Sequence, residues 1–135
     1  MRKLAVFLLA GVATAQAPNA FQPVATTMDL MKAMIVPASD VLFNAADDAP
    51  KNDEGWGKLR YQALLLIESG NLMMLEGRAR DQDQWMKDTR GQMDAAQLAL
   101  KAIAAKDLDK LVGDAGTAIV ESCQSCHLHY MKRAK

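Results

Sequence analysis

The chain has 135 residues, of which 50% are hydrophobic and only 5% aromatic, and its 16 Lys and Arg residues balance its 16 Asp and Glu residues. This balance gives no basic surface for nucleic acid, so nucleic-acid binding is not expected. Ala, Leu and Met are abundant and runs of β-branched residues are absent, which favours helices over strands. The length corresponds to one small domain, without repeats or a dividing linker.

The first 17 residues have the three parts of a secretory signal peptide. Arg2 and Lys3 form a basic start, an apolar run follows from 4 to 12, and small residues make an Ala-x-Ala pattern ending at Ala15 or Ala17. Cleavage after Ala15 is favoured, because the other site places Pro18 directly after the scissile bond. The run is too short to span a bilayer. We therefore expect a signal peptide over 1–17, a mature domain over 18–135, and no stable membrane span after cleavage.

The first predicted helix follows a short lead that contains two prolines. Thr26 or Thr27 can cap it, and it runs to about Ala46 with apolar residues at spacings of three and four along one face. Pro37 falls inside this helix. Because proline lacks the backbone N–H, we expect the helix to bend or open near Ala33.

Two further amphipathic helices are predicted after the first. Asp53 is the predicted cap of the second, and Gly77 its stop. The third begins near Asp81 or Asp83 and ends around Lys106, whose cation suits the C-terminal carbonyls. The acidic residues at the start of this helix are expected to face solvent: Asp81, Asp83 and Asp88.

A fourth helix begins after Asp107 and carries both cysteines of the chain, Cys123 and Cys126, on its inward face. Each of the four predicted helices is amphipathic and the connections between them are short. Such a pattern predicts an all-α protein built as an antiparallel four-helix bundle.

The pentapeptide 123–127, Cys-Gln-Ser-Cys-His, has the pattern of a c-type haem attachment site. Two thiols three residues apart can each add to one vinyl group of a porphyrin, while the adjacent His127 reaches the iron. A thioredoxin-type pair would need a nearby βαβ pattern, and a zinc site would need a second pair of ligands; the sequence has neither. A disulfide or two buried thiols would leave His127 unexplained.

The pattern Cys-x-x-Cys-His-x-x-Tyr that ends at Tyr130, on the last of four helices, resembles the cytochrome c′ family, the class II c-type cytochromes. The run 31–34, Met-Lys-Ala-Met, adds to the resemblance. It implies one haem c bound covalently to Cys123 and Cys126 on the C-terminal helix, with His127 as the proximal axial ligand. Family members often carry Arg after the Tyr and four residues before the distal position, where this chain has Met131 and Thr27.

In this family the first helix faces the last across the haem, and here it offers Met28, Met31 and Met34 along one stripe. Methionines at helical spacing often only fill a core. In the family, however, a Met at the distal position distinguishes six-coordinate, low-spin members from five-coordinate ones. Alignment of the run 31–34 favours Met31 as the distal ligand, with Met28 as the second choice. His129 is expected to be exposed and not a ligand.

Ligation by His127 and Met31 would make the protein a carrier of single electrons between periplasmic redox proteins, and not an enzyme. The rival hypothesis, without a Met ligand, is a five-coordinate binder of diatomic gases such as NO and CO. A third is a haem subunit of a periplasmic oxidoreductase. Export through the signal peptide agrees with all three, since bacteria attach c-type haem outside the cytoplasm. Many family members form a homodimer, an option that the resemblance extends to this chain.

Overall fold

A computed structural model describes residues 21–131 of the chain. Every regular element in this range is helical, so the protein is all-α, as its composition predicted. The expected signal peptide over 1–17 lies outside the described residues. Within the described range no helix combines the length and the apolar character needed to cross a membrane.

The first helical segment comprises α1 (Thr27–Leu30), the π-helical turn η1 (Met31–Ile35), α2 (Val36–Phe43) and the 3₁₀ turn η2 (Asn44–Ala46). It begins as predicted: the Thr26 hydroxyl accepts from the backbone N–H of Asp29, whose carboxylate in turn accepts from the backbone N–H of Thr26. This reciprocal capping box satisfies two backbone donors that a helix start leaves free.

The opening that Pro37 was expected to cause is confirmed. The backbone N–H of Val36 donates to the carbonyl of Met31, five residues back, in place of the usual four. Since Pro37 has no N–H to offer Ala33, the turn before it widens into a π-helix. The widened turn begins at Met31.

The second and third segments are α3 (Asp53–Met73) and α4 (Gln84–Ala104). The cap of α3 is Asn52 and not Asp53, because the Asn52 side chain accepts from the backbone N–H of Gly55. Asp53, the first residue of α3, instead pairs with Lys106 at 2.6 Å. Gly77 has a φ of 84°, which suits the reversal after α3.

The last segment comprises α5 (Leu108–Lys110), the π-helical turn η3 (Leu111–Ala115) and α6 (Gly116–Tyr130). The Asp107 carboxylate caps it by accepting from the backbone N–H of Lys110 at 3.0 Å. The predicted start after Asp107 is therefore confirmed. Lys106 makes the tight reversal after α4 with a φ of 53°.

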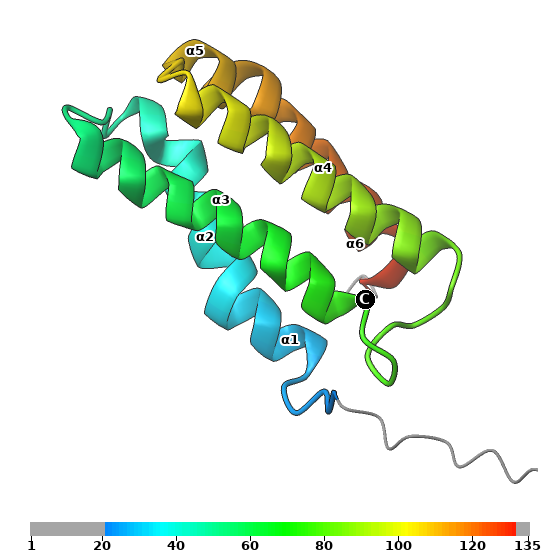
Figure 1. Ribbon diagram of the computed structural model, residues 1–135. Helices are drawn as coiled ribbons and strands as arrows, with labels where there is room; N and C mark the ends of the chain where they lie inside the picture. The colour runs from blue at the N-terminus through cyan, green and yellow to red at the C-terminus, as the bar shows by residue number, and fades with distance from the viewer. Residues whose placement is uncertain (1–20, 132–135) are drawn as a thin grey trace, which may run out of the picture.

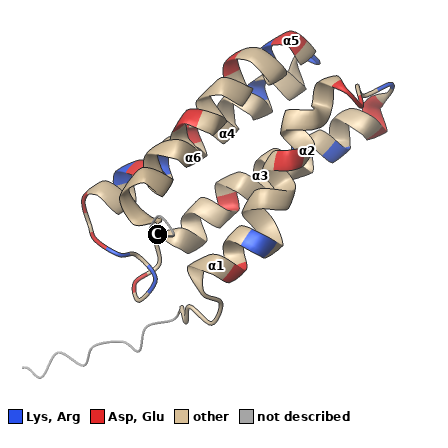
Figure 2. Ribbon diagram, turned by 180° about the vertical axis from the view of Figure 1, so that it is seen from behind, with Lys and Arg blue, Asp and Glu red and all other residues tan. Residues whose placement is uncertain are grey.

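Successive helical segments run in opposite directions, and Figure 1 shows α3 beside α2 and α4 beside α6. α3 also packs on α4, so the two pairs share one core. Small side chains allow close packing of α4 against its neighbours: Ala95, Ala96, Ala99 and Ala102 are all buried. Acidic and basic positions are interspersed along the outer surfaces of the helices (Figure 2).

Candidate functional site

The motif of α6 opens onto a cavity of about 200 Å³ between the first helical segment and α6. Cys123, Cys126 and His127 line it from α6, and Met31 lines it from η1. Asp88 reaches it from α4. Residues far apart in the sequence that were assigned to one haem site thus share one cavity.

The two cysteines are free thiols that are each about half-buried. Their spacing on a continuous helix places them one turn apart, on the same side of α6. His127 follows directly and is exposed at the mouth of the cavity. The motif therefore presents two thiols inside and one imidazole at the edge.

Burial raises the pKa of both thiols. For Cys123 burial is the main cause, and for Cys126 burial together with the nearby charges of Asp88 and Cys123 raises the pKa to about 11. A redox or nucleophilic cysteine needs the opposite shift, because the thiolate is the reactive form. The raised pKa values therefore do not favour a thioredoxin-type pair.

The three methionines of the first helix lie in different surroundings. Met31 packs against the core and lines the cavity that contains His127. Met28 is 58% exposed and does not line this cavity. Met34 packs against the core without reaching the cavity. The structure thus brings Met31 together with the motif and leaves Met28 apart from it.

Asp88 is buried, contrary to the expectation that it faces solvent with Asp81 and Asp83. Its Oδ1 accepts from Gln84 Nε2 at 2.8 Å and from Ser125 Oγ at 2.7 Å. Its Oδ2 lies 3.2 Å from His129 Nδ1. The expectation failed because α4 turns Asp88 inward, onto the face that packs against α6.

His129 is an exposed residue, as expected, with 47% of its side chain accessible. It does not line the cavity, and its Nδ1 faces Asp88. His127 and His129 therefore have different surroundings although they are two residues apart.

Tyr130, the last residue of the motif, fixes the end of α6 against the start of α4. Its hydroxyl donates to Asp81 Oδ2, and its ring meets the Trp85 ring edge to face. Asp81 Oδ1 accepts from the backbone N–H groups of Trp85 and Asp83. Asp81 is thus half-buried and structural, and the expectation that it is simply solvated is also wrong; Asp83 alone of the three is exposed.

Several residues of the cavity wall were not predicted as part of the site: Phe43, Met73, Thr89 and Gln92. Gln92 is buried, and its amide donates to the carbonyl of Leu66 at 3.0 Å. A signal for the α4 members was available. Trp85, Asp88 and Gln92 recur at spacings of three and four with the buried alanines, which places polar residues on a core-facing stripe.

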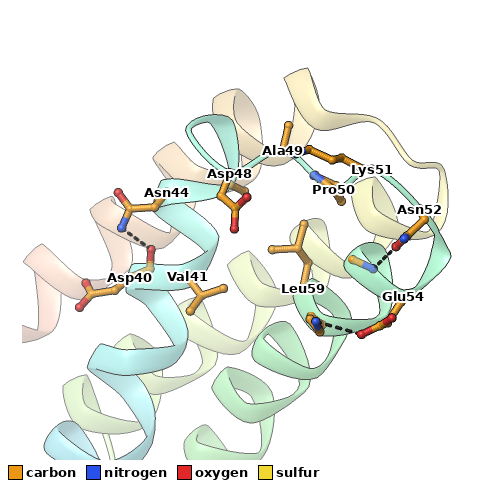
Figure 3. Close-up of a pocket in the computed structure, with 13 residues that line it drawn as sticks. Asp40, Val41, Asn44, Asp48, Ala49, Pro50, Lys51, Asn52, Glu54 and Leu59 are labelled. Atoms are coloured by element: carbon orange, nitrogen blue, oxygen red, sulfur yellow. Dashed lines mark hydrogen bonds and ion pairs between the residues drawn. The ribbon is translucent and has the colours of Figure 1, made fainter.

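A larger cavity of about 510 Å³ lies where α2 connects to α3 (Figure 3). The Asn44 amide donates there to the carbonyl of Asp40, and Lys58 pairs with Glu54. Its wall contains no Cys, His or Met. The one ion pair drawn in Figure 3, between Lys58 and Glu54, joins two residues one turn apart on α3, and the cavity lacks the thiols, thioether and imidazole found around α6.

Comparisons with protein-family models, curated proteins and solved structures give no match to this chain. The residues of the cavity are therefore the evidence that bears on function.

Proposed function

We propose that the protein is a periplasmic monohaem c-type cytochrome that carries single electrons between redox partners. In this proposal the helical segments form an antiparallel four-helix bundle of the cytochrome c′ type. Cys123 and Cys126 bind the haem through thioethers, His127 is one axial ligand and Met31 is the other. The observation that carries the proposal is the presence of all four side chains in the wall of one cavity.

The chemistry of the donor set fits this group. Two protonated, half-buried thiols suit addition across vinyl groups, in which the sulfur bonds to one carbon and the hydrogen goes to the other. Thioether and imidazole are soft and borderline ligands that suit haem iron. The remaining wall includes Phe43 and Met73, which offer apolar contacts to a macrocycle.

The cavity volume of about 200 Å³ is below the roughly 300–1,000 Å³ usual for ligand pockets. A macrocycle held by Cys123 and Cys126 would therefore extend beyond the enclosed space toward the mouth, where His127 is exposed. An exposed haem edge would suit electron transfer, because a redox partner can reach it in a weak and brief encounter.

Bound here, the haem would supply a one-electron couple, whose potential a His–Met ligand pair raises. The chain's own residues exclude water and fix the ligands. Met31 is held at the start of a π-helical turn, and His127 lies on a helix whose end is secured by Tyr130. Because His127 and Met31 would both ligate the iron, exchange of electrons would be favoured over binding of a gas.

The test is an optical spectrum of the purified holoprotein, oxidised and reduced, before and after addition of carbon monoxide. We expect sharp low-spin bands, a weak near-infrared methionine–iron band in the oxidised form, and no response to the gas. High-spin bands with prompt carbon monoxide binding would favour the five-coordinate gas binder and reject Met31 as a ligand. A chain that carries no covalent haem after expression with a c-type maturation system would reject the proposal altogether.

A further inference from the structure

Asp88 is the one buried charged residue in the described part of the chain, with 3% of its side chain accessible. A buried carboxylate is costly unless several donors surround it. Here Gln84, Ser125 and His129 provide partners for its two oxygens. Burial of this carboxylate costs free energy of folding, which indicates that Asp88 has a role at the site.

Two of these partners belong to the motif segment of α6. Ser125 lies between Cys123 and Cys126, and His129 lies two residues after His127. Because residues four apart share a helix face, Ser125 and His129 turn the same side of α6 toward α4. Asp88 therefore holds the motif on both sides of the Cys126–His127 pair.

The same carboxylate lines the cavity together with the cysteines and His127. Its Oδ1 lies 2.7 Å from the hydroxyl oxygen of Ser125, which stands between the two cysteines, so its charge lies close to the motif. A negative charge in a poorly solvated wall acts over longer distances than one in water. Oxidised haem iron carries one more positive charge than reduced iron, so a nearby carboxylate stabilises the oxidised form.

We infer that Asp88 is a positioning residue of the haem site, one that fixes the motif of α6 through Ser125 and His129 and lowers the reduction potential of the iron by its buried charge. This inference rests on the proposed function. The charge of Asp88 would counteract the rise in potential that a Met31 ligand brings, so the two residues would shift the potential in opposite directions.

The test compares midpoint potentials of the full-length, haem-loaded protein by optical redox titration at one pH and ionic strength. Asp88→Asn removes the charge and keeps the size of the side chain. The matched control is Asp94→Asn, an exposed carboxylate on the same helix. We expect a higher potential in Asp88→Asn, with a shift at least about threefold larger than in the control, where water screens the charge.

Equal shifts in the two variants would overturn the electrostatic role, because a purely structural Asp88 would not move the potential selectively. Ser125→Ala tests positioning without removing the charge. We expect it to reduce the fraction of chains with both thioethers formed, measured by mass, and to leave the potential near that of the wild type.

If Asp88→Asn does not accumulate, the test depends on Ser125→Ala. A Ser125→Ala variant with the wild-type fraction of chains carrying both thioethers would overturn the inference. A wild-type chain without haem would overturn the proposed function and the inference together. Haem-loaded wild-type protein with unresponsive variants would overturn the inference only.

Discussion

The ring of Tyr130 meets the ring of Trp85 edge to face, with centroids 5.0 Å apart and planes at 77°. Edge-to-face contact is one of the two arrangements that aromatic pairs favour. It joins the last residue of the Cys-x-x-Cys-His-x-x-Tyr pattern to the first turn of α4. The Tyr therefore secures the end of the helix that carries the motif, three residues after His127.

The Tyr130–Asp81 hydrogen bond makes stability depend on pH at both extremes. The Tyr130 hydroxyl, followed by the backbone N–H of Trp85, holds the pKa of Asp81 below its usual 3.8. Its contribution is complete above 3.8 and is lost as pH falls through the folded pKa. Burial, followed by the bond to Asp81, raises the pKa of Tyr130 from 10.0 to about 12. That contribution is complete below 10.0 and is lost as pH rises to about 12.

Tyr130→Phe should accordingly lower the melting temperature at neutral pH and flatten its fall at both extremes. Thermal unfolding followed by circular dichroism between acid and alkaline pH measures this. Tyr61→Phe is the control, because Tyr61 is 62% exposed. A Tyr130→Phe profile parallel to that of the wild type would show that the bond to Asp81 contributes nothing.

Trp85 is the largest fully buried side chain, and its Nε1 donates to the Met73 carbonyl at the end of α3, 2.9 Å away. Trp85→Phe removes this donor, leaves a buried carbonyl unpaired and opens a small void. We expect a loss of about 2–4 kcal/mol in the free energy of unfolding. Denaturant unfolding provides the measurement.

Trp56→Phe is the companion variant, since Trp56 is only half-buried. Its loss should stay near 1 kcal/mol. Equal losses in the free energy of unfolding for the two variants would show that the burial of Trp85 and its bond to Met73 do not account for its contribution to stability.

The helix pattern could be predicted because it depends on local chemistry. Thr26, Asp107 and Pro37 each act on backbone groups within a few residues, so their effects can be recognised in the sequence. The cap of α3 was assigned one residue late, because Asn52 and Asp53 are both good caps and only the backbone decides between them.

The cavity could be predicted only in part. The spacing of the cysteines and His127 is a local pattern that can be recognised directly in the sequence. The burial of Asp88 depends on the rotation of α4 relative to α6, which brings Ser125 within 2.7 Å of its carboxylate. Its position near a helix start favoured solvent exposure, and packing between the helices overrode that preference.

Met31 and Met28 allow a direct test of which methionine would bind the iron of the proposed haem. Met31 lines the cavity with His127, whereas Met28 is 58% exposed. Met31→Ala should abolish the near-infrared methionine–iron band and create binding of carbon monoxide. Met28→Ala should change neither. The reverse pattern would assign the ligand to Met28, one helical turn earlier.

Pro37→Ala tests whether the π-helical turn places Met31. Alanine at this position can donate its N–H to the carbonyl of Ala33, which favours an ordinary α-helical turn in place of the bond from Val36 to Met31. Removing the extra residue from the turn rotates the preceding helix relative to α2 and should turn Met31 away from its present direction. We expect a weaker methionine–iron band and partial carbon monoxide binding, with helix content unchanged by circular dichroism.

The matched substitution is Pro50→Ala, in the connection between α2 and α3 and outside the cavity with His127. It should leave the spectrum of the wild type intact. An unaltered band in Pro37→Ala would show that packing of Met31 against the core holds the thioether in place without the widened turn. A band lost in both variants would point to a general loosening of the protein, and the direction of Met31 would then not depend on Pro37.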